Sequence, residues 1–235
     1  MDRNNSIKEM SSYIATLIHD LKTPVSAQIM AVDLLLKGSF GSMNSEQREV
    51  LEQIKKSCEY SQNLVHSILD TYLCENGQLK PKPEIFDWQK LVGLAIDETC
   101  TLAKDKSQKI VAKNYTNNTE IFADKFQLKR VIVNLISNAI KYGFDNSIIE
   151  IETKKDKGRL IFNVKNNSKY INNYDTNRLF DKFRRDKRGK SGISCGLGLY
   201  LVKQIITAHK GKVFGKCEKS GECNFGFSIP IKNNF

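Results

Sequence analysis

The first third of the chain alternates apolar and polar residues with the period of a long amphipathic helix. Between Tyr13 and Leu36, alternating steps of four and three residues select apolar positions with one exception. Such a heptad seam is typical of helices that pack side by side. The seam consists of Ile14, Ile18, Leu21, Val25, Gln28, Val32 and Leu35. We expect the polar residues 1–12 to be a frayed lead-in, and Pro24 to kink the helix.

A second seam follows a break that is marked by Gly38, Gly41 and Asn44. Its positions, one of them polar, are Leu51, Ile54, Cys58, Ser61, Val65, Ile68 and Tyr72. Asn44 or Ser45 can cap this second helix. Two such helices joined by a short loop form an α-helical hairpin, which cannot bury both seams alone. Pairing two hairpins into a four-helix bundle would bury them, so the pattern predicts a C2 homodimer.

The periodicity changes after Glu75–Pro83, a stretch whose glycine and prolines are typical of a linker. We therefore expect a helical domain at residues 1–76, a linker at 77–83 and a second domain at 84–235. In the second domain the pattern predicts helices at 88–104, 126–142 and 197–209, and strands at 85–87, 109–115, 120–123, 148–153, 159–165, 212–216 and 224–231. This order indicates an α+β sandwich, a mixed sheet with helices on one face. The irregular stretch 166–195 is too long to be a passive connection.

Composition adds few constraints to this picture. Apolar residues make up 40% of the chain and charged residues 27%, as in ordinary globular proteins. No apolar run approaches the ~20 residues that cross a bilayer, and the first residues do not resemble a signal peptide. We therefore expect a cytoplasmic protein without a membrane segment.

The six cysteines have no metal-ligand spacing and are expected to be free thiols, although Cys217 and Cys223 flank a turn and could touch.

The formal charge of +11 calls for a negatively charged partner. The basic residues are spread along the chain and do not interleave with aromatic residues, so we do not expect a nucleic-acid partner. An acidic protein partner and a bound polyphosphate both fit. The one dense basic group lies at Lys182–Lys190.

One candidate for chemistry is His19, which lies in the segment His19-Asp20-Leu21-Lys22-Thr23-Pro24 of the first predicted helix. Residues four apart share a helical face, so Thr23 lies within one turn of His19. His19 follows the seam residue Ile18 and is therefore expected at the edge of the bundle, open to solvent. Alone, it is more typical of an ordinary surface histidine than of a catalytic one.

A second candidate site combines a helix stripe with a glycine-containing turn. Asn134, Asn138 and Lys141 share one stripe of the helix predicted at 126–142. An asparagine oxygen is a ligand that Mg²⁺ accepts alongside phosphate oxygens, and a lysine suits the phosphates themselves. The turn Gly196-Leu197-Gly198-Leu199 opens the next helix, where backbone N–H groups and the helix N-terminus favour anions. The basic segment before it could close over a triphosphate and neutralise charge.

Taken in order, these motifs resemble the catalytic core of the sensor histidine kinases of two-component systems, over roughly residues 13–231. His19–Pro24 resembles the H-box and Asn134–Tyr142 the N-box of that family. Leu179–Phe183 resembles the F-box, and Gly196–Leu199 the second glycine box. The resemblance implies a dimeric HisKA-type dimerisation and phosphotransfer domain followed by a Bergerat-type ATP-binding domain of the HATPase_c kind.

The resemblance also implies roles for individual residues. His19 would be the phosphoacceptor that attacks the γ-phosphate of ATP, Asp20 would orient its ring, and Thr23 would position water when the partner is dephosphorylated. Asn138 would be the ligand of Mg²⁺. The nucleotide would be bound by Asn134, Asn138, Lys141, Tyr142, Asn166, Arg185, Gly196, Leu197, Gly198 and Leu199.

One motif departs from the family pattern. The first glycine box reads Asp-x-Gly-x-Gly in the family, whereas this chain has Asn166-Asn167-Ser168-Lys169-Tyr170. Asn166 keeps an acceptor oxygen for the adenine amino group but loses the charge, which is worth about 1 kcal/mol. The missing glycines restrict the backbone and crowd the base pocket. We therefore expect weakened ATP binding.

Two functions follow from the resemblance. The first is an ATP-dependent kinase that autophosphorylates His19 and transfers the phosphoryl group to an aspartate of a response-regulator receiver domain, for which a basic surface is suited. The alternative is a degenerate kinase that acts as a dimeric scaffold or as a Thr23-dependent response-regulator phosphatase. A gyrase- or chaperone-type ATPase would share the nucleotide fold but not the H-box. Since only a short segment precedes His19, we expect the signal to come from a longer chain or from a separate sensor protein.

Overall fold

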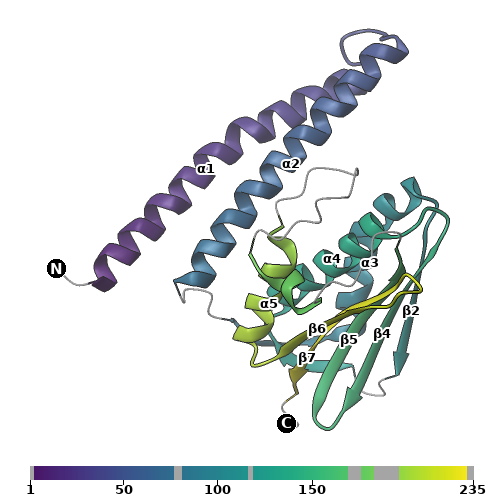
Figure 1. Cartoon of the computed structure of the whole chain (residues 1–235). Helices are drawn as coiled ribbons and strands as arrows, with labels where there is room; N and C mark the ends of the chain where they lie inside the picture. The colour runs from purple at the N-terminus through teal and green to yellow at the C-terminus, as the bar shows by residue number, and fades with distance from the viewer. Residues whose placement is uncertain (1–2, 77–80, 116–118, 169–175, 183–195, 232–235) are drawn as a thin grey trace. The chain divides into compact units, whose positions relative to one another are not determined.

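The computed structural model describes residues 3–76, 81–115, 119–168, 176–182 and 196–231. The chain divides into two compact units, Met1–Gln78 and Leu79–Phe235. The first unit is a helical hairpin and the second combines a sheet with helices (Figure 1). No described helix has both the length and the apolarity to cross a bilayer.

The hairpin consists of α1 (Arg3–Leu36) and α2 (Ser45–Glu75). The expectation of a frayed lead-in over residues 1–12 was wrong, because α1 already begins at Arg3. Residues 3–12 contain neither glycine nor proline, so no residue in them interrupts a helix that extends from the apolar positions after Tyr13. The helix also continues through Pro24.

The second helix begins with a reciprocal cap. The N–H of Gln47 donates to Asn44 Oδ1 at 2.8 Å, and the N–H of Asn44 donates to Gln47 Oε1 at 3.0 Å. This is a capping box, in which two backbone donors at a helix start are satisfied by side chains. Of the two predicted caps, the structure therefore selects Asn44. Arg48 adds a bond from its Nη2 to the carbonyl of Leu36, which ties the start of α2 to the end of α1.

Polar contacts join the two helices, but much of their apolar surface stays uncovered. Lys55 Nζ lies 2.7 Å from Asp33 Oδ1, and Gln62 Nε2 donates to Ser26 Oγ at 2.9 Å. Among the side chains that the structure describes in the hairpin, Val32 is the one apolar residue that is fully buried. Large apolar side chains remain exposed at Leu21, Met30, Leu34, Val50 and Ile54. A single hairpin therefore leaves these apolar side chains without cover.

The second unit is built on a five-stranded sheet with the order β2-β4-β5-β7-β6. β2 and β4 are parallel and the other neighbours are antiparallel. Three helices cover one face of this sheet (Figure 1). The elements are β1 (Glu84–Asp87), α3 (Trp88–Asp105), β2 (Lys109–Tyr115), β3 (Glu120–Ala123), α4 (Lys125–Tyr142), β4 (Ile148–Asp156), β5 (Arg159–Asn167), the 3-10 helix η1 (Thr176–Phe180), α5 (Gly198–Ala208), β6 (Lys212–Cys217) and β7 (Glu222–Pro230). The predicted fold class is confirmed, with β1 and β3 forming a separate pair.

The hairpin β4–β5 is longer than predicted, since its strands pair as far as Asp156 and Arg159. The two residues between them, Lys157 and Gly158, have φ angles of 46° and 71°. Positive φ at both positions is typical of a type I′ turn, whose twist matches that of the flanking strands. The ladder therefore continues to the turn itself.

The core of the second unit centres on three aromatic rings. Trp88 makes edge-on contacts with Phe162 and Phe227, with ring centroids 5.6 and 6.2 Å apart. The Trp88 Nε1–H donates to Thr153 Oγ1 at 3.1 Å. Since the indole N–H is satisfied by a strand residue, the first turn of α3 is fixed against the buried face of the sheet.

Asp124 anchors the start of α4. Its Oδ1 accepts the N–H of Gln127 at 2.9 Å, and its Oδ2 accepts the N–H of Lys82 at 2.8 Å. The Asp124 N–H donates to His209 Nε2 at 3.2 Å, while His209 Nδ1 lies 2.8 Å from the carbonyl of Ile205. This geometry requires the tautomer with its proton on Nδ1. The segment before β1, the start of α4 and the end of α5 are thus joined at one carboxylate and one imidazole.

We predict that Phe162→Ala lowers the free energy of unfolding by about 3–5 kcal/mol, because it leaves a cavity beside Trp88. Trp88 is the only tryptophan of the chain, so urea unfolding followed by its fluorescence reports on this unit. Phe126→Ala is the matched control, since that ring is 70% exposed and its loss should change the free energy by no more than about 0.5 kcal/mol. Equal losses in the two variants would contradict this description of the core.

Candidate active site

The packing of α4 determines which of its residues remain accessible. Seven apolar side chains of the helix are buried: Leu128, Val131, Ile132, Leu135, Ile136, Ala139 and Ile140. Asn134, Asn138 and Lys141 lie on the remaining stripe and are only partly buried. The predicted stripe of polar residues therefore exists on the helix and is open to a ligand.

Asn134 lies against the start of α5. Its Nδ2 donates to the carbonyl of Arg130 at 3.0 Å, which fixes the side-chain amide. A Cβ atom built on Gly198 would lie 2.9 Å from Asn134 Oδ1, closer than such contacts allow. The absence of a side chain at Gly198 thus lets the two helices meet here. The structure brings together two motifs that are more than 60 residues apart in the chain.

The turn before α5 presents backbone rather than side chains. Gly196 has a φ of 68°, a left-handed conformation that favours glycine. Leu197 is buried and takes the N-cap position without a side-chain hydrogen bond, and Gly198 and Leu199 begin the helix. Since Leu197 has no side-chain acceptor, the N–H groups of the first turn can serve an anion.

The C-terminal end of α4 carries further positive charge. Lys141 Nζ lies 5.6 Å from the centroid of the Tyr142 ring, a cation–π contact. Lys106 Nζ donates to the carbonyls of Ile140 and Lys141 at 3.0 and 2.8 Å. A cation at this end of a helix is favourable because the last carbonyls carry partial negative charge.

Asn166 lies at the end of β5, beside the end of α4. It is buried, and its Nδ2 atom has no hydrogen-bond partner among the described residues. A Cβ atom built on Gly143 would lie 3.6 Å from that Nδ2. The N–H of Phe144 donates to the carbonyl of Asn167 at 3.0 Å and fixes the two segments together. A buried amide without a partner is costly, so a polar group of a ligand would be bound favourably here.

Sequence reasoning missed Gln108, whose amide is buried beside the same glycine. Gln108 Nε2 donates to the carbonyls of Ile140 and Phe144 at 3.2 and 2.9 Å. It would lie only 3.0 Å from a Cβ atom on Gly143. The glycine directly after a predicted helix is a known sequence signal for its end, but nothing local points to a glutamine 35 residues earlier.

The segment that resembles the F-box is packed against α5 and β7. The Phe180 ring is buried, and its centroid lies 6.2 Å from that of Phe225. Asp181 Oδ1 lies 3.5 Å from Lys203 Nζ of α5. Arg185, predicted to reach the phosphates, lies outside the described residues.

The remaining predicted residues belong to the helical hairpin. His19, Asp20 and Thr23 all lie on α1, and a continuous helix keeps Thr23 one turn from His19. Asp20 and Thr23 are exposed, and the side chain of His19 lies outside the described part of the structure. The phosphoacceptor candidates and the α4–α5 cluster are therefore carried by different units of the chain.

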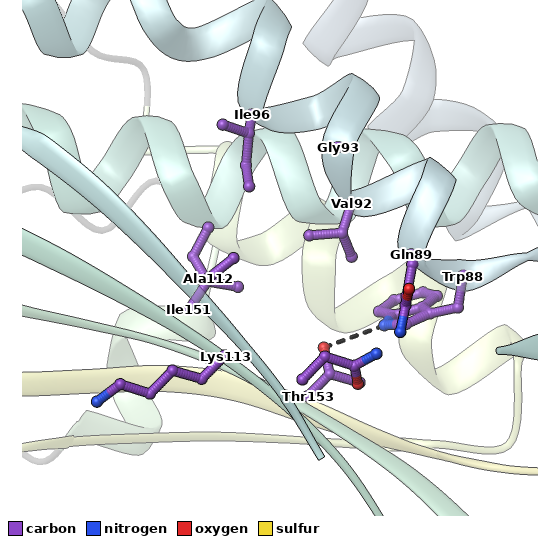
Figure 2. A pocket seen from close by; sticks show the side chains of 10 residues that line it. Trp88, Gln89, Val92, Gly93, Ile96, Ala112, Lys113, Ile151 and Thr153 are labelled. Carbon is purple, nitrogen blue, oxygen red and sulfur yellow. Dashed lines mark hydrogen bonds between the residues drawn. The ribbon is translucent and has the colours of Figure 1, made fainter. Parts of the chain in front are cut away.

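A cavity of about 230 Å³ lies elsewhere in the second unit, between α3 and the edge of the sheet at β2. Figure 2 shows Trp88 and Thr153 on its wall, joined by their hydrogen bond. None of the predicted site residues lines it. The cavity is thus separate from the cluster formed by α4, α5 and the end of β5.

Two protein families match successive, separate parts of the chain. The model of the HisKA family, the His Kinase A (phospho-acceptor) domain, matches residues 9–73. The model of the HATPase_c family, described as histidine kinase-, DNA gyrase B- and HSP90-like ATPase, matches residues 123–233. The chain belongs to the sensor histidine kinases and comprises their catalytic core.

Individual relatives agree with this assignment. The circadian input-output histidine kinase CikA of Synechococcus elongatus is 28% identical over 206 residues, which cover 86% of this chain and 27% of that protein. The sensor protein RprX of Bacteroides fragilis is 25% identical over 99% of this chain and 46% of its own length. The chain therefore spans less than half the length of these relatives.

The fold is shared with solved histidine kinases. Full-length ShkA in complex with AMPPNP superposes with a TM-score of 0.75 at 21% identity, over 94% of this chain and 46% of that one. At this identity the likeness supports the fold alone. It covers both the helical hairpin and the unit that contains the sheet.

We predict that Gly198→Ala destabilises the second unit by about 1 kcal/mol, because the new methyl group collides with Asn134 Oδ1. When Gly198→Ala is made in a chain that already carries Asn134→Ala, it should be neutral or slightly stabilising. The collision is then gone, and alanine is a better helix former than glycine. Urea unfolding with Trp88 as the probe measures both differences. An equal cost in the two backgrounds would show that Asn134 and Gly198 are not in contact.

Proposed function

We propose that the chain is an ATP-dependent protein histidine kinase that autophosphorylates His19 and transfers the phosphoryl group to an aspartate of a response-regulator receiver domain. The main support for this proposal is the close approach of Asn134 on α4 to Gly198 at the start of α5. It joins a polar helix stripe to a helix N-terminus, which together suit the phosphates of a nucleotide.

Residues of three elements would bind the nucleotide. The buried amide of Asn166 has an unpaired donor and an acceptor oxygen, which suits the polar edge of a base. The first turn of α5, with Gly196, Leu197, Gly198 and Leu199, would receive the phosphates. Lys141 adds positive charge and Tyr142 an aromatic surface at the end of α4. Arg185 would reach the phosphates from the segment before α5.

Mg²⁺ would be held jointly by protein and nucleotide. Asn138 offers a single amide oxygen, and Mg²⁺ usually keeps phosphate oxygens and waters as its other ligands. Asn134 supports it, because its Nδ2 is bonded to Arg130 and its oxygen is thereby directed toward α5. The metal would supply charge neutralisation at the phosphates.

His19 would carry the phosphoryl group in two steps. A ring nitrogen attacks the γ-phosphorus, so that an N–P bond forms as the bond to the ADP oxygen breaks. Asp20, the next residue, would hold the imidazole in orientation and stabilise its positive charge. An aspartate carboxylate of the receiver then attacks the same phosphorus and restores the neutral histidine. The exposure of Asp20 and Thr23 is consistent with access by a partner domain.

The hairpin would form a homodimer with a second copy of the chain. Leu21 and Ile54 belong to the two predicted seams and are 52% and 44% exposed. A second hairpin that packs on these seam positions in a four-helix bundle would remove their apolar side chains from water. The partner that receives the phosphoryl group would be acidic, as the charge of +11 favours. A separate sensor protein or a longer chain would deliver the signal, and the location would be cytoplasmic.

One observation favours a second function. At the end of the site that would bind the adenine base, this chain has the amide of Asn166 where the family pattern has a carboxylate. A neutral group must therefore bind the adenine amino group. If ATP binds too weakly for phosphorylation, the dimer would serve as a scaffold, or as a phosphatase of the receiver in which Thr23 positions the water. Labelling and binding experiments separate the two functions.

We predict that incubation with labelled ATP and Mg²⁺ gives acid-labile label on the wild-type chain and none on His19→Gln, because phosphohistidine hydrolyses in acid. The chain has three histidines, and His66→Gln on α2 is the matched control that should keep its label. A folded dimer that neither binds nucleotide nor takes up label would favour the scaffold or phosphatase. Label that persists in His19→Gln would place the phosphoacceptor elsewhere.

We predict that Asn166→Asp raises the affinity for ATP by about fivefold, because a charged acceptor binds the adenine amino group about 1 kcal/mol more strongly. Asn167→Asp is the control, since it adds the same charge on an exposed neighbour whose side chain points to the other face of the strand. Titration with a fluorescent ATP analogue measures both. Equal changes in the two variants would show a general charge effect and remove Asn166 from the base site.

A further inference from the structure

Two cysteines face each other at the end of the β6–β7 hairpin. Cys217 and Cys223 are register partners across the two strands. The next pair toward the turn is Glu218 and Glu222, where the N–H of Glu218 donates to the carbonyl of Glu222 at 2.8 Å. Hydrogen-bonded and non-hydrogen-bonded pairs alternate along an antiparallel ladder, so the two cysteines occupy a non-hydrogen-bonded position. There the Cα atoms lie about 4.5 Å apart, within the range that a disulfide spans.

The two thiols differ in accessibility and in acidity. Cys217 is partly exposed and Cys223 is buried. The hydrogen bond between them lowers the pKa of the Cys217 thiol, whereas that bond and burial raise the pKa of the Cys223 thiol. The thiolate is the reactive form of cysteine. Cys217 is therefore suited to meet an oxidant from solvent, and Cys223 to react with it afterwards.

The pair adjoins the base end of the candidate nucleotide site. Cys223 is also the register partner of Asn166 on β5, so their side chains point to the same face of the sheet. On this face Phe162 of β5 and Phe227 of β7 pack against Trp88 of α3. The turn of the hairpin is bonded to the same segment, since the N–H of Ser168 donates to the carbonyl of Gly221 at 2.8 Å. The hairpin is thus joined to Asn166–Ser168, the described part of the altered first glycine box.

We propose that Cys217 and Cys223 form a reversible disulfide that couples the oxidation state of the protein to nucleotide binding at Asn166. A peroxide is the class of oxidant. The Cys217 thiolate attacks one peroxide oxygen, the O–O bond breaks, and a sulfenic acid and water form. The Cys223 thiol then attacks the Cys217 sulfur, an S–S bond forms, and a second water leaves. Two thiols and one hydrogen peroxide thus give one disulfide and two waters, and a dithiol reverses the reaction.

The bond would act on Asn166 by moving its neighbour. A disulfide holds the sulfurs about 2.05 Å apart, whereas two thiols in contact lie well over an ångström further from each other. Closing the bond therefore draws Cys223 Sγ toward β6 and away from the Asn166 side. The amide of Asn166 loses part of the wall that holds it in place, so the oxidised form is expected to bind ATP more weakly. The part of this inference that concerns ATP rests on the proposed function.

The test treats the full chain with hydrogen peroxide, and then with dithiothreitol, and measures three quantities. Peptide mass mapping should find one Cys217–Cys223 disulfide. Amide exchange should change at Ser168, whose N–H is bonded to the hairpin turn. The dissociation constant for ATP should rise by at least about fivefold on oxidation and return on reduction. Cys217→Ser and Cys223→Ser should abolish all three responses, whereas the matched controls Cys58→Ser and Cys100→Ser should keep them.

The possible results distinguish a failure of this inference from a failure of the proposed function. A disulfide between other cysteines, a crosslink between two chains or no disulfide at all would overturn the inference. A Cys217–Cys223 disulfide without a change at Ser168 would overturn the coupling. If the reduced protein binds no ATP, the proposed nucleotide site is wrong, while mass mapping and the exchange at Ser168 still decide the inference. The Cys217→Ser variant keeps the buried Cys223 in place, so loss of folding does not account for its response.

Discussion

The burial of α4 against the sheet is the constraint on which the candidate site depends. Successive residues of an α-helix are rotated by about 100°, so a helix with seven buried apolar side chains has only one acceptable orientation about its axis. In that orientation Asn134, Asn138 and Lys141 face away from the core. A rotation by one residue would expose apolar side chains and bury the two amides and the ammonium group. The hydrophobic core thus determines where the polar groups of the site point.

The position of α4 along its axis is fixed by contacts at its two ends. At the start, Asp124 caps the helix and is itself bonded to His209 at the end of α5. At the other end, Lys106 binds the last carbonyls, and Phe144 is bonded to the end of β5. Since α5 and β5 carry the other parts of the site, the same few hydrogen bonds set the distances between its components. Structural and functional roles are therefore divided between neighbouring residues of one helix.

The sequence predicted most elements of the fold because their periodicity is local. The apolar residues of α4 recur with the helical period, and the paired strands β4 and β5 alternate as expected for one buried face. The start of α1 was predicted too late, since polar residues without glycine or proline carry no signal against a helix. The members of the site could be found by their motifs. Their meeting at Gly198, and the burial of Gln108 and Asn166 around Gly143, depend on long-range packing that no local pattern records.

The hydrogen bond between the Lys82 N–H and Asp124 Oδ2 fixes the place at which the chain enters the second unit. The polypeptide that follows α2 reaches its first described hydrogen bond to this unit at the same carboxylate that caps α4. The chain is therefore held to the N-terminus of α4 two residues before β1 begins. Release of that bond would free one carboxylate oxygen and loosen the cap. The linker is thus fastened to the helix that carries the polar stripe, and not merely to the surface of the domain.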